Sequence, residues 1–202
     1  MTVVIRIDDL SSNESQSIVR EHMAGMLDNT PSESFHAFSL DKLRQTHVTF
    51  WTAWLGSELC GCGALQTLGH QHGEIKSMRT RAKFLRQGVG QAVLSHIVAE
   101  ASAKGLKRLS LETGSAESFS AARSLYLRNG FEICSPFGDY KLDPYSVFMT
   151  KLLWVTLSRS LKEGRTVGGD KSPTQHIKLN FGVLYNGVVV KYCFEKNTKR
   201  NV

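Results

Sequence analysis

The chain has 202 residues, of which 41% are hydrophobic and 21% charged, as is ordinary for a globular protein of one domain with an appendage or of two small domains. No apolar run approaches the ~18–20 residues needed to span a bilayer. The amino-terminal stretch MTVVIRIDDLSS also lacks the basic segment of a signal peptide. We therefore expect a cytoplasmic protein with no membrane partner.

The net charge of +7 is divided unevenly along the chain. Residues 1–150 contain 15 basic and 15 acidic residues, whereas residues 151–202 contain 10 basic and 3 acidic ones. A basic protein can bind nucleic acid, but the main part of this chain is neutral, so we expect no nucleic-acid partner there. The chain is expected to form a main domain over residues 1–153 and a basic extension over residues 154–202.

The first half of the chain is read from its periodicity. Alternating β-branched residues predict strands, and apolar residues spaced three or four apart behind a serine predict a capped helix. The pair Gly56-Ser57 predicts the turn of a hairpin, and a short helix begins near Ser39 or Asp41. The expected elements are, in order, a strand at 3–10, a helix within 11–30, a loop and short helix at 31–45, a hairpin at 48–68 and a strand at 72–80.

The second half alternates between helical and extended patterns. Apolar residues at helical spacing follow Gly88, and Gly105 supplies a stop signal. A second helix is expected to be capped by Ser115 or a neighbour and to end at Gly130. The expected elements are a helix at about 88–103, a strand at 106–113, a helix at 115–130, a strand from 131–134 and a strand at 146–153. Helices alternating with strands after an early hairpin predict a mixed α/β sheet.

The last quarter of the chain has a different pattern. Residues 160–175 are polar and Gly-rich and are typical of a linker or loop. Residues 176–196 alternate around Asn186-Gly187, a hairpin signal. An isolated hairpin is marginal in water, so this extension either packs on the main domain or is poorly ordered, and it could be dispensable.

The four cysteines, Cys60, Cys62, Cys134 and Cys193, form neither a CxxC pair nor the spacing of a zinc site. We expect free thiols in a reducing cytosol. No metal site is expected.

The stretch LRQGVGQAVLSHI, residues 85–97, places Gly88 and Gly90 directly before a helical pattern. Because glycine costs backbone entropy, either the turn requires these residues or something approaches the backbone closely. A strand, a Gly-rich turn and a helix N-terminus form an anion site, since free N–H groups and the helix dipole favour negative charge. The stretch matches neither GxxxxGK[ST] nor GxGxxG, and a tight turn with close packing is the alternative interpretation.

Three segments in order extend this interpretation: GEIKSMRT, LRQGVG and SLYLRNGF. Together they resemble the GNAT superfamily of N-acetyltransferases, in which R/Q-x-x-G-x-G/A opens the helix after the fourth strand and LY-x-x-x-GF ends a later helix. The likeness covers about residues 3–152. With RLSLETGS and DPYSVFMTK, the chain is similar to a bacterial branch, the YsnE-type acetyltransferases. The resemblance implies the acyl-CoA N-acyltransferase fold, an α/β (α+β) architecture with a mixed, mostly antiparallel sheet flanked by helices.

The resemblance also implies that acetyl-CoA is the cosubstrate. Backbone N–H groups at the start of the helix would bind its pyrophosphate, although Leu85 stands where the family carries Arg or Gln. The pantetheine arm would pair with the fourth strand where this strand splays from the fifth, and the N–H of Met78 would polarise the thioester carbonyl. Phe119 replaces an Asn that often contacts the cofactor, with Ser118 or Ser120 as substitutes. The implied cofactor-binding residues are Met78, Arg79, Thr80, Arg86, Gln87, Gly88, Val89, Gly90, Gln91 and Phe119.

Two catalytic roles follow from the resemblance. Tyr126 matches the tyrosine of the family and would protonate the departing thiolate. A protonated amine must lose a proton before attack, and Glu74, directly or through a water, is the expected base. Glu74 lies four residues before Met78, and strand alternation would put both on one face. Glu112, on the next strand, is the rival base.

The implied acceptor is a primary amine of a small molecule or peptide. In this fold the first two helices and their loop usually wall the acceptor pocket, and this places Ser34 and His36 there. Lys76 and Arg79 are candidates to bind a carboxylate on the acceptor, and Glu112 also belongs to the expected substrate region. The resemblance allows a homodimer.

Two other functions stay open at this point. The departures at Leu85 and Phe119 allow a non-catalytic acyl-CoA-binding sensor that kept the pocket and lost turnover. The basic residues of 154–202 allow association of this extension with nucleic acid or a membrane, which would be sensitive to salt.

Overall fold

The computed structural model describes residues 2–28, 31, 36–153, 179–185 and 188–194. The chain divides into two compact units, one within Met1–Thr156 and the other within Leu157–Val202. In the second unit, strands β8 (Leu179–Tyr185) and β9 (Val188–Phe194) pair antiparallel, with Tyr185 opposite Val188. The linker expected within 160–175 and the candidate Ser34 lie outside the described residues.

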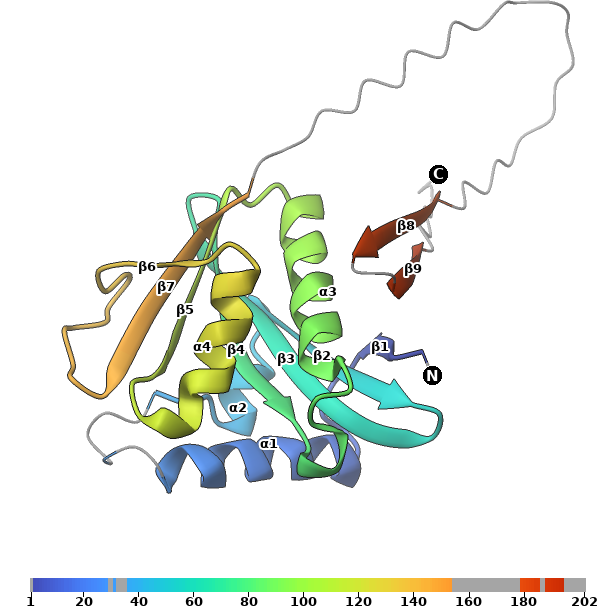
Figure 1. Cartoon of the computed structure of the whole chain (residues 1–202), viewed down its shortest axis with the longest axis horizontal. Helices are drawn as coiled ribbons and strands as arrows, with labels where there is room; N and C mark the ends of the chain where they lie inside the picture. The colour runs from blue at the N-terminus through green and yellow to red at the C-terminus, as the bar shows by residue number, and fades with distance from the viewer. Residues whose placement is uncertain (1, 29–30, 32–35, 154–178, 186–187, 195–202) are drawn as a thin grey trace, which may run out of the picture. The chain divides into compact units, whose positions relative to one another are not determined.

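The first unit is built on one seven-stranded sheet (Figure 1). Among the described residues of this sheet, five of the six pairs of neighbouring strands run antiparallel, and the pair of β4 with β5 runs parallel. This arrangement confirms the expected mixed, mostly antiparallel sheet. In their order across the sheet, the strands are β1 (Val4–Ile7), β2 (Val48–Leu55), β3 (Glu58–Gly69), β4 (His72–Thr80), β5 (Arg108–Gly114), β7 (Ser146–Leu152) and β6 (Glu132–Ile133).

In the part of the first unit that the structure describes, four α-helices accompany the sheet: α1 (Asn13–Leu27), α2 (Leu40–Leu43), α3 (Val89–Ala103) and α4 (Ser120–Arg128). Ser12 caps α1 by accepting a hydrogen bond from the N–H of Ser15 over 3.1 Å. Ser39, rather than Asp41, caps α2, since its hydroxyl accepts from the N–H of Lys42. None of the helices in the described part of the chain is long and apolar enough to cross a membrane.

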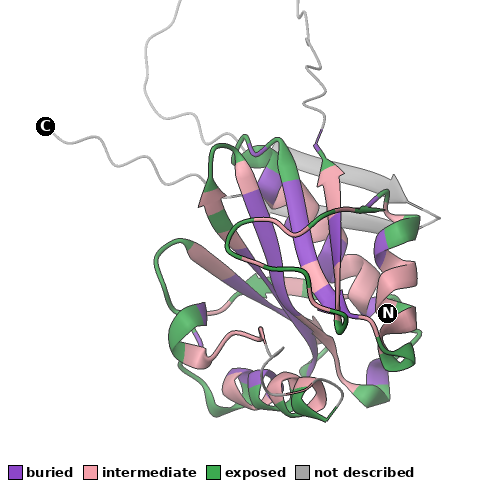
Figure 2. Ribbon diagram, turned by 90° about the vertical axis from the view of Figure 1, so that its left-hand side faces the viewer, coloured by how far each residue is buried: buried purple, intermediate pink, exposed green. Residues whose placement is uncertain are grey.

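The helices cover both faces of the sheet. Successive side chains of a strand point to opposite faces, and here they belong to two different hydrophobic clusters. Trp51 and Leu65 pack with residues of α3, whereas Phe50 and Ala64, beside them in sequence, pack with residues of α1 and α2. Figure 2 shows that the buried residues concentrate in the central strands. A Cβ at Gly63 of β3 would lie 2.7 Å from a Val93 methyl group, so a glycine here lets α3 lie close against the sheet.

The helix expected from Ser115 begins later than its sequence indicates. Glu117–Phe119 form a 3₁₀ turn, and the α-helix starts at Ser120. The hydroxyl of Ser115 donates to the carbonyl oxygen of Pro144 over 2.8 Å, so it links the end of β5 to the start of β7 and does not cap a helix. The prediction of a cap at Ser115 or a neighbour was therefore wrong, since the N-cap residues Ala116 and Phe119 also make no side-chain cap hydrogen bond.

Strand β4 departs from regular geometry at two places. It pairs with β5 only from His72 to Ile75, so the two strands separate beyond this point. Further along, Ala64 pairs with Lys76 and Cys62 with Arg79, so two residues of β4 lie opposite one residue of β3. Ser77, at this β-bulge, has a positive φ of 52°.

The bulge reverses which side chains of β4 share a face, because one extra residue shifts the alternation. Glu74 and Lys76 lie on the α2 side, where they line a cavity. After the bulge, the sulfur of Met78 lies against Gly63 together with Val93 of α3. Glu74 and Met78 therefore lie on opposite faces, and the expectation from simple alternation was wrong.

Candidate functional site

The expected anion site lies at the start of α3. Arg86 and Gly88 both adopt left-handed backbone conformations, with φ of 61° and 80°, and Gly88 is the N-cap of the helix. The backbone of a turn with this conformation and the first N–H groups of the helix can converge on an anion. The left-handed φ explains Gly88, since a side chain there would be strained.

Gly90 has another explanation. A Cβ at Gly90 would meet only Leu125 at 3.4 Å and the Thr80 hydroxyl at 3.5 Å, which are ordinary contacts. Neither packing nor a positive φ requires a glycine at this position. A Cβ at Gly88 would meet nothing within 4 Å. The open space over Gly88, and the lack of a packing reason for glycine at position 90, fit the close approach of a diphosphate to bare backbone.

Several side chains of the loop at residues 86–91 already have partners within the protein. Gln91 exchanges two hydrogen bonds with Asn129, at the end of α4, over 2.7 and 2.9 Å. The amide of Gln87 donates to the carbonyl oxygen of Lys83 over 3.0 Å. The side chain of Val89 is buried in the core. The backbone N–H groups, together with the exposed guanidinium of Arg86, are therefore the groups of this loop that are suited to bind an anion.

Tyr126 lies on α4, which packs beside the start of α3 through Leu125 and Asn129. The ring is buried and contacts Phe131 edge-on, with 5.8 Å between centroids. Burial, and to a smaller degree the negative charge of Glu112, raises the pKa of Tyr126 above its ordinary value. This phenol keeps its proton at neutral pH and can donate it or a hydrogen bond.

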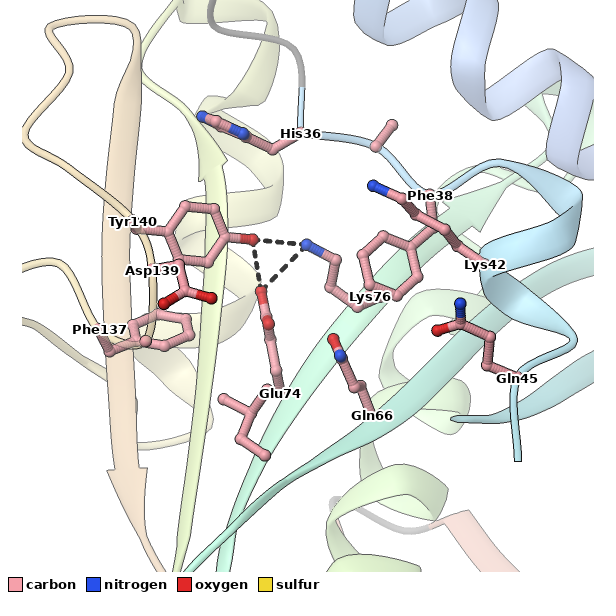
Figure 3. A pocket seen from close by; sticks show the side chains of 13 residues that line it. His36, Phe38, Lys42, Gln45, Gln66, Glu74, Lys76, Phe137, Asp139 and Tyr140 are labelled. Atoms are coloured by element: carbon pink, nitrogen blue, oxygen red, sulfur yellow. Dashed lines mark hydrogen bonds and ion pairs between the residues drawn. The ribbon is translucent and has the colours of Figure 1, made fainter. Parts of the chain in front are cut away.

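Glu74 of β4 is almost fully buried and takes part in a triad of side chains (Figure 3). The ammonium of Lys76 lies 3.0 Å from Oε1 of Glu74, and the hydroxyl of Tyr140 donates to the same oxygen over 2.6 Å. Lys76 also donates to the Tyr140 hydroxyl over 2.5 Å. A buried carboxylate is costly unless it is paired, and these two donors compensate it.

The triad lines a cavity of about 430 Å³ on the α2 side of the sheet. Its walls come from the segment before α2, from β3 and β4, and from the loop between β6 and β7 (Figure 3). The lining includes His36, Phe38, Lys42, Gln45, Gln66, Leu68, Glu74, Lys76, Phe137, Asp139 and Tyr140. A concave site with a buried acid and a few polar groups is typical of a small-molecule pocket.

Comparison with known proteins identifies the family of the chain. The model of the Acetyltransferase (GNAT) family matches residues 15–131. The chain belongs to the GNAT family. It is 56% identical over 149 residues to the uncharacterized N-acetyltransferase YsnE of Bacillus subtilis, a match that covers 74% of this chain and 99% of the relative. It is 48% identical over 149 residues to the uncharacterized N-acetyltransferase YedL of Escherichia coli, covering 74% of this chain and 94% of the relative.

A solved structure with the same fold is PaiA N-acetyltransferase from Thermoplasma acidophilum in complex with coenzyme A. Its TM-score is 0.57 at 19% sequence identity, and the match covers 76% of this chain and all of the other. This GNAT protein is an acyltransferase of the N-acetyltransferase type, with acetyl-CoA as its cosubstrate. The open backbone at Gly88 and Gly90, and the edge of β4 that is unpaired with β5 beyond Ile75, fit such a cosubstrate.

The remaining residues that were expected to bind the cofactor or the acceptor of this GNAT enzyme lie in several separate places. The Thr80 hydroxyl faces Gly90, whereas the guanidinium of Arg79 lies against Gly25 of α1, on the opposite face. The ring of Phe119 lies over Gly114, where a Cβ would come within 2.3 Å of it. His36 lines the cavity and contacts Tyr140 edge-on, with 5.1 Å between ring centroids. No group of three or more potential metal ligands occurs among the described residues.

Glu112, the rival base, has its own partner. The hydroxyl of Ser146 donates to Oε1 of Glu112 over 2.7 Å. Burial raises the pKa of this carboxyl, while the bond from Ser146 and the charges of Lys76 and His36 act in the opposite direction. Among the described residues, Glu74 lines the cavity and Glu112 does not. This difference favours Glu74 for contact with an acceptor.

Tyr140 was not anticipated from the sequence. It lies in the segment SPFGDYKLDPYS, which has no periodicity and connects two strands. The only signal was an aromatic residue in a connection, a place where functional residues often occur. Lys76 was expected to bind an acceptor carboxylate, but its ammonium already pairs with Glu74.

Proposed function

We propose that the chain transfers an acetyl group from acetyl-CoA to a primary amine of a small molecule or peptide, and that the amine enters through the cavity around Glu74. The observation that carries this proposal is the position of Glu74. It is a buried carboxylate, held by Lys76 and Tyr140, that lines a cavity just before the point where β4 separates from β5.

Glu74 acts as the base, directly or through a water. An amine with a pKa of about 10 is mostly protonated at neutral pH, so it must lose a proton before it can attack. Lys76 and Tyr140 both contact Oε1, so Oε2 is the oxygen that would accept the proton of the amine. Fixing a carboxylate in this way favours a productive orientation.

Tyr126 acts as the acid for the departing thiolate. Its raised pKa keeps the phenol protonated, and α4 places it next to the loop at the start of α3. Arg86 to Gln91 supply backbone N–H groups for the pyrophosphate, since the bare backbone of Gly88 and Gly90 is open to a ligand. The N–H of Met78, directly after the bulge, polarises the thioester carbonyl.

Two further properties belong to the proposal. A cytoplasmic location agrees with the free thiols of Cys60, Cys62 and Cys134 in the described part of the chain. A homodimer rests on the family resemblance alone, and light scattering of the purified full-length chain tests it.

The reaction itself is tested by following free thiol release from acetyl-CoA with a panel of amino acids, polyamines, aminoglycosides and peptides. We expect release that depends on the amine and an acetylated product that can be identified by mass. Tight binding of acetyl-CoA without turnover on any amine would contradict the proposal.

A further inference from the structure

The charged side chains of the cavity lie on two opposite sides. Lys42 and Gln45 come from α2 and the residues after it, and Asp139 comes from the loop between β6 and β7 (Figure 3). Glu74 and Lys76 lie between these sides and neutralise each other. The remaining charges are therefore one ammonium on the α2 side and one carboxylate on the opposite side.

Lys42 is available to a ligand. Its side chain is exposed and pairs with no acidic side chain among the described residues. Its ammonium lies 5.6 Å from the centroid of the Phe38 ring, and the ammonium of Lys76 lies 4.6 Å from the same ring. Because Glu74 compensates Lys76, Lys42 supplies the uncompensated positive charge on this side of the described cavity lining, and this charge favours a carboxylate on the ligand.

Besides its polar residues, the cavity lining contains a group of apolar, mostly aromatic side chains. Phe137 contacts Tyr140 edge-on with 5.2 Å between ring centroids, and Phe38 faces them across the cavity (Figure 3). Leu68 also belongs to the lining. Such walls bury an apolar or aromatic group, and aromatic pairs add to the affinity beyond burial. A small polar acceptor would leave this surface uncovered.

We propose that the acceptor is an apolar amino acid, preferably an aromatic one, whose amine lies at Glu74 and whose carboxylate lies toward Lys42. This inference rests on the proposed function and names its substrate class. It disfavours polyamines and aminoglycosides, because an additional positive charge on the α2 side of the cavity would meet Lys42.

The test compares phenylalanine with phenylalaninamide, glycine and spermidine in the full-length enzyme, by kcat/KM for each at saturating acetyl-CoA. We expect kcat/KM for phenylalanine to exceed that for its amide by about two- to fivefold, the range of one exposed charge pair. Lys42→Gln should reduce this preference to near unity without changing the affinity for acetyl-CoA. Lys104→Gln, at the C-terminal end of α3 and outside the cavity lining, is the matched control and should keep the preference.

Equal kcat/KM for phenylalanine and its amide, higher kcat/KM for spermidine, or a preference that survives Lys42→Gln would overturn this inference and leave acetyl transfer standing. Absence of turnover with every amine, while acetyl-CoA still binds, would overturn the proposed function and this inference with it.

Discussion

The hydroxyl of Tyr140 donates a hydrogen bond to Oε1 of Glu74 over 2.6 Å, although 66 residues of chain separate the two. The loop between β6 and β7 thereby reaches back to β4 and fixes a buried carboxylate at the wall of a cavity. Lys76 completes the triad from the same strand face as Glu74. This arrangement joins the proposed base to the loop that forms one side of the acceptor pocket.

Tyr140→Phe should lower kcat for amine acetylation by about tenfold, because a hydrogen bond to a charged group contributes roughly 1.5–3 kcal/mol. The affinity for acetyl-CoA should not change, since Tyr140 lies in the acceptor cavity. Tyr145→Phe, at a residue that is 48% exposed, is the control and should behave as the unmodified enzyme. A Tyr140→Phe enzyme with unchanged kcat would show that Glu74 does not depend on this contact.

Gly90→Glu should weaken acetyl-CoA binding by at least about a hundredfold, because placing like charges together costs several kcal/mol. Gly90→Ala should retain the fold and most of the affinity, since its Cβ has ordinary contacts at 3.4 and 3.5 Å. Isothermal titration with acetyl-CoA checks both variants. Equal affinity in Gly90→Glu and Gly90→Ala would remove the pyrophosphate from this loop.

Tyr126→Phe should reduce kcat by roughly 10²-fold or more, the contribution expected of a general acid. The affinity for acetyl-CoA should stay nearly the same, because the variant keeps the ring that packs on Phe131. Pre-steady-state and equilibrium binding measurements separate the two effects. If affinity collapsed with kcat, Tyr126 would be a structural residue of α4.

Acidification should destabilise the enzyme partly through His22. Burial, together with the positive charges of Arg79 and Lys76, lowers the pKa of His22 to about 4 from its ordinary value near 6.5. The fold favours the neutral imidazole, so its contribution is complete above about pH 6.5 and is lost as the pH falls toward 4. His22→Gln should show a smaller fall in Tm between pH 7 and pH 5 than the unmodified enzyme, as measured by calorimetry.

The fall in Tm between pH 7 and pH 5 should differ by several degrees between His22→Gln and the unmodified enzyme, since 1 kcal/mol corresponds to roughly 2–4 °C in a domain of this size. His70→Asn is the matched control at an exposed residue with a positive φ, which asparagine tolerates. An identical pH dependence in His22→Gln and His70→Asn would contradict the assignment to His22.

The element order of the main domain was predictable because its signals are local. Periodicity and glycines marked the helix after Gly88, and the structure starts this helix at Val89. The bulge in β4 was not predictable, because Ser77 takes a positive φ that favours glycine and nothing in GEIKSMRT marks it. That one extra residue moved Met78 to the face opposite Glu74, and the prediction for this pair failed.

The sequence allowed individual residues of the candidate site to be predicted, but not the contacts between them. Motif likeness pointed to Glu74 and Tyr126 one by one. The triad depends on Tyr140, whose position is set by how a connection without periodicity folds over the sheet. Long-range contacts of this kind leave no pattern in a single sequence, since no spacing rule relates a loop residue to a distant strand.

The central claim is that Glu74 serves as the base in the acceptor cavity, and its most direct test is kcat in a Glu74→Gln, Lys76→Met double variant. Removing one partner of a buried pair typically costs about 3–5 kcal/mol, so each single variant should lose stability and the double variant should recover most of it. In this stably folded double variant, we expect kcat to be lower by roughly 10²-fold or more and the affinity for acetyl-CoA to stay within about twofold of that of the unmodified enzyme. A stable double variant with kcat close to that of the unmodified enzyme would contradict the claim.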